Sequence, residues 1–154
     1  MTPAAYMFAK QCEAEEKRKR LSFDQMQELA RWEKERRDAE HRCQCSCVQW
    51  FRLEYPQLAT LLFAVPNGTN KSKTARMRFK AEGLTAGVSD LLLLVPKGIY
   101  HGLCIEMKSK TGRQSKEQRA WQKKVTEQGY LYLLCRSFDE FHSGIQKYLT
   151  ESPK

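Results

Sequence analysis

The chain has 154 residues, of which 41% are hydrophobic, and it carries a formal net charge of +9. This length allows one compact domain with an added helix, and no apolar run approaches the roughly 18 residues of a membrane span. The N-terminus has no charged start followed by an apolar stretch. We therefore expect neither a secretory signal nor a membrane partner, and we place the protein in the cytoplasm.

The first 42 residues predict a long, solvated helix. Residues 12–42 are rich in Glu, Lys, Arg and Gln and contain neither Gly nor Pro, and Ser22 with Gln25 fits a capping box. From about residue 40 to residue 55 the helix gains an apolar side, which Pro56 ends.

The rest of the chain alternates strands and helices. Strands are predicted at residues 61–65, 90–95, 102–108 and 130–135, and turns around 66–68 and 96–98. Helices are predicted at residues 71–82, 115–128 and 137–149, the last two with capping boxes, Ser115 with Gln118 and Ser137 with Glu140. This order predicts an α/β fold with a mixed central sheet flanked by helices.

The excess positive charge lies in the middle of the chain. Residues 1–42 contain ten Lys or Arg and nine Asp or Glu, whereas residues 71–124 contain thirteen Lys or Arg and four Asp or Glu. A concentrated basic surface attracts phosphates by Coulomb steering and counterion release. The pattern favours a nucleic-acid partner, and a protein that is merely basic is the competing interpretation.

Three of the six cysteines, Cys43, Cys45 and Cys47, are spaced by two residues and not by the three of a Cys-x-x-Cys zinc knuckle. A zinc site that includes His41 is the minority interpretation, and free thiols are favoured. Cys104 and Cys135 fall in predicted strands, where cysteine acts as a small hydrophobic residue.

Two acidic residues are predicted to meet at one edge of the sheet. Asp90 opens the strand that runs to residue 95, and Glu106 lies near the end of the returning strand. A hairpin between these strands brings the two carboxylates together, and strand alternation places Lys108 on the same face as Glu106. The competing interpretation is a Lys–carboxylate salt bridge at a sheet edge.

Paired carboxylates at the end of an apolar hairpin are typical of a divalent metal site. Mg²⁺ takes hard oxygen ligands and usually keeps positions for water and substrate phosphate, and Mn²⁺ accepts the same ligands. The metal activates water and stabilises the charge that develops on phosphate. Lys108 could orient or deprotonate that water or neutralise the phosphate. We therefore predict a magnesium-dependent nuclease built on Asp90, Glu106 and Lys108.

Several segments in this order resemble the VRR-NUC nucleases, a branch of the PD-(D/E)xK superfamily. The segments are residues 65–68 (VPNG), 87–93 (GVSDLLL), 102–108 (GLCIEMK), 112–115 (GRQS) with Gln118 and Trp121, 128–130 (QGY) and the closing helix 137–149. The resemblance covers roughly residues 40 to 149. The family's usual Pro before the aspartate is Ser89 here, which bears on local backbone geometry and not on the metal ligands.

The resemblance implies a restriction-endonuclease-like core at residues 40–150, preceded by a charged helical extension at residues 1–39. It implies that Asp90 and Glu106 hold the metal, that Lys108 is the catalytic lysine and that Glu40 helps to bind metal. Gln44 matches a glutamine near the site, and Gln118 matches the glutamine on the helix after the catalytic strand. Glu40 as a surface charge and Gln118 as a capping residue alone are the competing interpretations.

Basic side chains around this edge form the expected DNA contact surface. They are Lys71, Lys73, Arg76, Arg78, Lys80, Lys110, Arg113, Lys116 and Arg119. Stand-alone family members resemble structure-specific enzymes of phage or prophage replication and repair, including Holliday-junction resolvases. By analogy we expect branched DNA as substrate, a homodimer, and a bacterial or phage-infected host cell. The alternatives left open are a non-catalytic DNA-binding module and a zinc or redox regulator that uses Cys43, Cys45 and Cys47.

Overall fold

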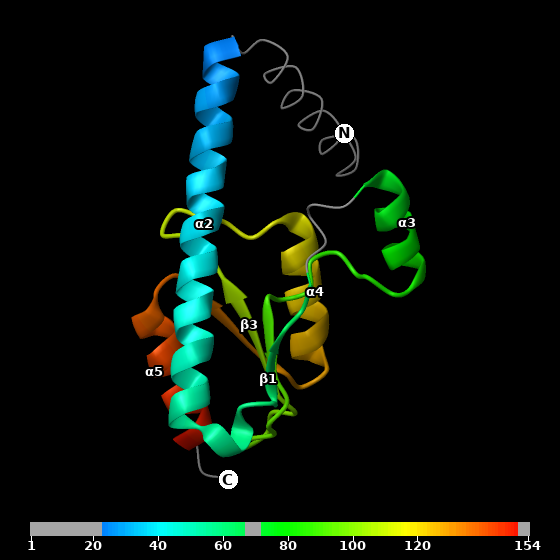
Figure 1. The fold of residues 1–154 in the computed structure, drawn as a ribbon. Coiled ribbons are helices and arrows are strands. Elements are labelled where there is room, and N and C mark those ends of the chain that lie inside the picture. Colours follow the sequence, from blue (N-terminus) through cyan, green and yellow to red (C-terminus); the bar gives the residue numbers. More distant parts are fainter. Residues whose placement is uncertain (1–22, 67–71, 151–154) are drawn as a thin grey trace, which may run out of the picture. The chain divides into compact units, whose positions relative to one another are not determined.

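The computed structural model describes residues 23–66 and 72–150 (Figure 1). Contacts within the chain divide it into two units, residues 1–38 and residues 39–154. None of the helices in the described ranges is long and apolar enough to cross a membrane.

Helix α2, Phe23–Glu54, is one continuous helix, and it lies within the helix expected from residue 12 to residue 55. The expected start of that helix and its Ser22 cap lie outside the described residues. Within the N-terminal unit the side chains of α2 are mostly exposed. Arg31 Nε donates to Glu35 Oε1 at 3.0 Å, and the Arg36 guanidinium lies 5.3 Å from the centre of the Trp32 ring. Exposed i,i+4 ion pairs of this kind add only a few tenths of a kcal/mol to a helix.

The C-terminal half of α2 buries one face because apolar side chains recur at helical spacing. Cys47 and Phe51, four residues apart, are completely buried, and Trp50 packs edge-on against Phe138. Pro56 has no backbone N–H and cannot continue the helix, so the chain turns into a 3-10 helix, Pro56–Leu58. The end predicted at Pro56 is confirmed.

The sheet has four strands in the order β1-β2-β3-β4. They are β1 Leu62–Ala64, β2 Leu91–Leu93, β3 Leu103–Met107 and β4 Leu131–Cys135. The first two neighbouring pairs are antiparallel, and β3 runs parallel to β4. The predicted mixed sheet is confirmed, with strands shorter than the apolar patterns suggested.

Strands β2 and β3 form the predicted hairpin. Leu91 pairs with Ile105 and Leu93 with Leu103. At the turn the backbones of Lys97 and Tyr100 exchange hydrogen bonds of 3.0 and 2.8 Å, and Gly98 has a φ of +55°. This register sets Asp90 opposite Glu106, one step beyond the Leu91–Ile105 pair.

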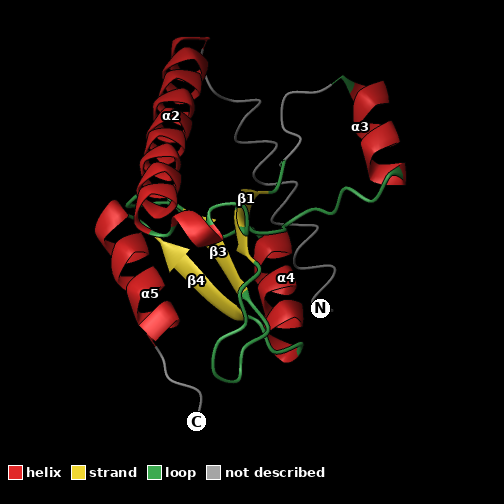
Figure 2. Cartoon of the chain, turned by 60° about the horizontal axis from the view of Figure 1, so that its bottom comes forward, coloured by secondary structure: helices red, strands yellow, loops and turns green. Residues whose placement is uncertain are grey.

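Helices cover both faces of the sheet (Figure 2). α5, Phe138–Thr150, packs with α2 on one face, where the core contains Leu91, Ile105, Met107, Phe141 and Ile145. α4, Lys116–Glu127, lies on the other face and connects the parallel strands β3 and β4. Strand β4 is half-buried except for the buried Cys135, because it lies at the edge of the sheet. Its apolar sequence had suggested a strand that is buried throughout.

Helix caps follow the sequence closely at α4 and less closely at α5. The Ser115 side chain accepts from Gln118 N, and the Gln118 side chain accepts from Ser115 N, which completes the predicted box. At α5 the Ser137 hydroxyl accepts from Glu140 N at 3.2 Å, but the Glu140 carboxylate accepts from Arg136 N instead of Ser137 N. Only one arm of the second box is therefore formed.

Candidate active site

The candidate site begins where Asp90 meets the end of β3. Asp90 Oδ2 accepts the backbone N–H of Met107 at 2.8 Å, which fixes the aspartate beside Glu106. The Asp90 charge acts on Glu106 and raises its pKa. The structure thus places the two carboxylates next to each other across the hairpin, as the sequence predicted.

Glu106 is completely buried, and three side chains donate hydrogen bonds to it. Lys108 Nζ lies 2.5 Å from Oε1, and the Gln118 amide donates to the same oxygen. The Tyr132 hydroxyl donates to Oε2 at 3.3 Å. The carboxylate is therefore held by Lys108 directly after β3, by Gln118 of α4 and by Tyr132 of β4.

Burial dominates the ionisation of Glu106. Removing the carboxylate from water, with a smaller effect of the neighbouring Asp90 charge, raises the pKa of Glu106 from 4.5 to about 7. Lys108 and the Tyr132 hydroxyl act in the opposite direction. A carboxylate with a pKa near neutrality in a polar cluster is a functional-site candidate, because burial disfavours its charged form more than its partners stabilise it.

Lys108 follows β3 and points back to Glu106, as strand alternation predicts. Its side chain is 11% exposed, and its backbone N–H donates to Cys135 O at 2.8 Å. The ammonium is therefore held at the edge of the carboxylate pair while it still reaches solvent. An ion pair with a fully buried partner keeps this position far better than a surface pair does.

Gln118 has both of the roles considered for it. Its side-chain oxygen accepts Ser115 N at 2.8 Å, while its side-chain NH₂ group donates to Glu106. The capping box therefore orients the amide, and the amide connects the first turn of α4 to the carboxylate.

Glu40 lies close to the end of β3, on the opposite side from α4. Glu40 Oε1 accepts the backbone N–H of Ser109 at 2.8 Å, one residue beyond Lys108. In the described part of the chain no group of three His, Cys, Asp or Glu side chains is placed to hold a metal ion. The structure thus brings Asp90, Glu106, Lys108 and Gln118 together and leaves Glu40 bound to the neighbouring backbone.

Gln44 is half-buried one turn further along α2. It lines a largely apolar groove of about 420 Å³ together with His41, Cys45, Val48, Gln49, Arg52, Leu53 and Ala64. The groove and the carboxylate pair share no residue.

The basic side chains fall into two groups. Lys110, Arg113, Lys116 and Arg119 are exposed on the loop after β3 and the start of α4, and Arg119 donates to Gln114 O at 2.6 Å. In α3, Lys73–Ala81, Arg78 pairs with Glu82 at 2.8 Å and Lys80 is exposed. Lys71 and the side chains of Lys73 and Arg76 lie outside what the structure describes.

The described cysteines are free thiols. Cys45 Sγ lies 3.6 Å from His41 Nε2, and Cys47 is buried beside Cys43. Burial raises the pKa of the Cys104 thiol to about 11 and that of Cys135 to about 12. Thiols that stay protonated are poor nucleophiles, so these residues act as core side chains.

Two residues of the site were given no role from the sequence. Tyr132 and Gln114 join the Glu106 cluster, and only the placement of β4 beside β3 makes their contribution visible. Ser89, treated as a departure from the family pattern, is buried and donates to Leu91 O at 3.1 Å, so its hydroxyl has a local partner.

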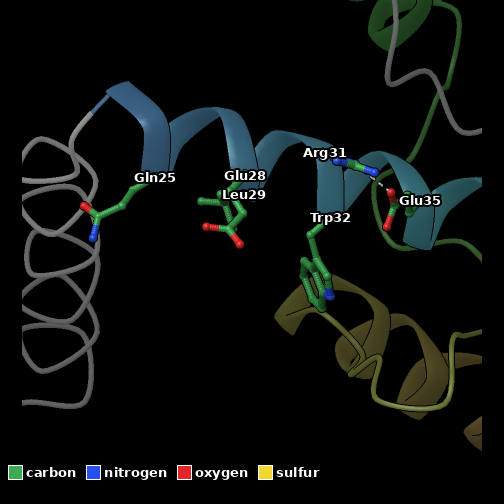
Figure 3. Close-up of a pocket in the computed structure, with 6 residues that line it drawn as sticks. All are labelled: Gln25, Glu28, Leu29, Arg31, Trp32 and Glu35. Atoms are coloured by element: carbon green, nitrogen blue, oxygen red, sulfur yellow. Dashed lines mark hydrogen bonds and ion pairs between the residues drawn. The ribbon is translucent and has the colours of Figure 1, made fainter.

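A separate surface pocket lies along α2 in the N-terminal unit (Figure 3). It is lined by Gln25, Glu28, Leu29, Arg31, Trp32 and Glu35, of which Arg31 and Glu35 form an ion pair. It contributes no residue to the carboxylate cluster.

A four-stranded mixed sheet between helices, with an Asp, a Glu and a Lys at one strand end, defines a nuclease-type α/β domain. The VRR-NUC domain model matches residues 18–139, so the chain belongs to the VRR-NUC domain family. A solved structure described as a VRR_NUC domain protein has the same fold, with a TM-score of 0.65 and 24% identity, covering 74% of this chain and 90% of that chain. The comparison with curated proteins gives no match.

The family match starts earlier than the motifs suggested. It begins at residue 18, whereas the sequence motifs placed the start of the resemblance near residue 40 and left the N-terminal helix out. Helix α2, which carries Glu40, likewise extends upstream of that residue.

Proposed function

We propose that this chain is a metal-dependent DNA endonuclease that hydrolyses phosphodiester bonds at the Asp90–Glu106 pair. The observation that carries the proposal is the buried Glu106 carboxylate, which lies beside Asp90 and receives the Lys108 ammonium at 2.5 Å. Membership of a nuclease family supports the same reaction class. Catalysis is assigned to residues 40–150, and residues 1–39 form a charged extension.

The donor set suits a hard divalent cation. Both Asp90 and Glu106 offer carboxylate oxygens, and the charged form of Glu106 is disfavoured by burial and by its acidic neighbour. A divalent cation removes this penalty, and Mg²⁺ or Mn²⁺ needs only one or two carboxylates because water and substrate phosphate complete its shell. We propose that Asp90 and Glu106 hold the ion and that Glu40 adds a third carboxylate nearby.

Each remaining side chain has a proposed task. We assign Lys108 to orienting the attacking water or neutralising charge on the phosphate, which its confined ammonium suits. To deprotonate that water, Lys108 would have to act as the neutral amine. Gln118 orients Glu106 from the start of α4, and Gln44 lies on the same helix as Glu40. When bound, the metal supplies Lewis-acid stabilisation and a more acidic water.

The substrate is proposed to be DNA, and in particular branched DNA such as a Holliday junction. Exposed Lys110, Arg113 and Lys116 at the start of α4 offer phosphate contacts on the same side of the sheet as Glu106. The α3 side chains Arg78 and Lys80 offer a second group of possible phosphate contacts. Because a junction requires two cuts, we propose that the protein acts as a homodimer. By analogy with phage-type members of the family, we propose a role in replication and repair.

Cleavage of labelled DNA tests the proposal. The substrates are single strand, duplex, flap, splayed arm, four-way junction and supercoiled plasmid, each with Mg²⁺, Mn²⁺ or EDTA. We expect metal-dependent cutting with a preference for the junction, abolished in Glu106→Ala. Binding without cutting under every condition would replace the nuclease with a non-catalytic DNA-binding module.

A further inference from the structure

A chain of three hydrogen bonds connects Gln122 of α4 to Glu106. Gln114 Nε2 donates to Gln122 Oε1 at 2.8 Å and to the Tyr132 hydroxyl at 3.3 Å. The Tyr132 hydroxyl in turn donates to Glu106 Oε2 at 3.3 Å. The four residues come from the loop before α4, from α4, from β4 and from β3.

The chemistry of these groups fixes the direction of each bond. An amide nitrogen only donates, and an ionised carboxylate only accepts. The two hydrogens of Gln114 Nε2 are therefore used on Gln122 and Tyr132, and the single hydrogen of the Tyr132 hydroxyl is left for Glu106. Gln114 accordingly makes the hydroxyl a donor toward the carboxylate.

Helix α4 holds the two oxygens of Glu106 by two different routes. Gln118 donates directly to Oε1. Gln122, one helical turn later on the same face, reaches Oε2 through Gln114 and Tyr132. Helix α4 therefore contributes to the position of both oxygens and fixes the orientation of the carboxylate.

We propose that Tyr132 is a positioning residue, which holds Glu106 in the orientation that binds the divalent cation. The inference rests on the proposed function, since it concerns the same carboxylate. Groups that hydrogen-bond to a metal ligand set its direction, and their loss typically lowers metal affinity by about 10–100-fold. The Tyr132 ring also packs edge-on against Trp121, with centroids 6.2 Å apart, so the hydroxyl is presented by a fixed ring.

Tyr132→Phe is the direct test because it removes only the hydroxyl and keeps the ring contact with Trp121. Tyr130→Phe is the matched control, since Tyr130 precedes the same strand and packs against His101. Mn²⁺ binding to each full-length protein, without DNA, is measured by electron paramagnetic resonance. We expect a dissociation constant about 10–100-fold higher for Tyr132→Phe and within about twofold of wild type for Tyr130→Phe.

A second variant covers the case in which Tyr132→Phe does not fold. Gln114→Met keeps the tyrosine and removes the amide that directs its hydrogen, and we expect weaker Mn²⁺ binding in the same direction. Cleavage by either variant should recover as Mn²⁺ is raised. If Tyr132→Phe binds Mn²⁺ as tightly as the wild type does, the inference about Tyr132 is wrong and the proposed function stands. If Tyr132→Phe is unfolded, the same result for Gln114→Met has the same meaning. A wild-type protein that binds no Mn²⁺ would overturn both the inference and the proposed function.

Discussion

Glu40 Oε1 accepts the backbone N–H of Ser109 at 2.8 Å, across 69 residues of sequence. This bond joins α2 to the chain immediately after Lys108. It uses one carboxylate oxygen of Glu40. Glu40 therefore has two possible roles: it anchors the end of β3, and it places a negative charge near the proposed metal site.

Glu40→Gln distinguishes these roles because the amide oxygen still accepts from Ser109 N while the charge is lost. We expect an unchanged melting temperature and a metal requirement for cleavage raised about 10-fold. Glu40→Ala should weaken both stability and metal use, since it also leaves the Ser109 N–H without its partner. Cleavage is measured as a function of metal concentration. If Glu40→Gln and the wild type need the same metal concentration, Glu40 has the anchoring role only.

Glu106→Gln is expected to stabilise the metal-free protein above pH 7. The unfolded carboxyl titrates near 4.5 and the folded one near 7, so between these values the folded protein binds more protons. The free energy of unfolding of the wild type therefore falls as pH rises through this window, by an amount on the order of 3 kcal/mol.

Glutamine has no charge to bury, so the variant should lack this loss, and the two proteins should converge below about pH 4.5. Urea unfolding from pH 4 to pH 8 in EDTA measures the difference. A wild type that is as stable as the variant at pH 8 would mean that the buried charge is already compensated without metal.

Gly87 should be essential for the placement of α4. Its φ is +83°, and an added Cβ would lie 2.4 Å from the Glu117 carbonyl carbon and 2.7 Å from Gln118 N. Gly87→Ala should therefore cost at least about 2 kcal/mol of stability and displace Gln118 from Glu106.

Gly83→Ala is the matched control for the backbone effect. Gly83 has a φ of +100° with no heavy atom within 4 Å of an added Cβ, so only backbone strain remains, about 1 kcal/mol. The free energy of unfolding of both variants is measured with urea. If both lose the same amount, α4 does not approach Gly87 closely.

Lys116→Ala should weaken DNA binding without affecting stability. Lys116 is exposed at the first position of α4, and loss of one phosphate contact should lower the slope of log affinity against log salt concentration by about one. Lys123, on the same helix but 3.9 Å from Glu127, provides the control. If Lys123→Ala changes the slope as much as Lys116→Ala, the DNA surface does not lie at the start of α4.

The sequence was sufficient for the parts that depend on local pattern. The apolar strands and the turn around Gly98 predicted the hairpin that joins Asp90 to Glu106, and the Ser115–Gln118 box predicted the start of α4. The ends of the strands were predicted less well, because they depend on packing partners that the sequence does not reveal. The partial exposure of β4 was missed for the same reason.

The contributions of Tyr132 and Gln114 could not be predicted from the sequence. Tyr132 reaches Glu106 only because β4 lies parallel to β3 with Cys104 opposite Tyr132, a register that no local signal specifies. Gln114 reaches Tyr132 because of the conformation of the loop before α4, which the sequence does not reveal. The positive φ of Gly87 is likewise a tertiary requirement, although its place in the motif ahead of Asp90 was visible.

Cleavage and binding by Asp90→Asn test the central claim most directly. Supercoiled plasmid and a labelled four-way junction are incubated with Mg²⁺ and equal amounts of wild type or variant, and DNA affinity is measured on the same preparations. The account predicts that cleavage falls by at least about 1000-fold, comparable to the loss of other groups that stabilise transition-state charge, while DNA affinity changes little. An Asp90→Asn protein that cuts at the wild-type rate would contradict a metal site at the Asp90–Glu106 pair.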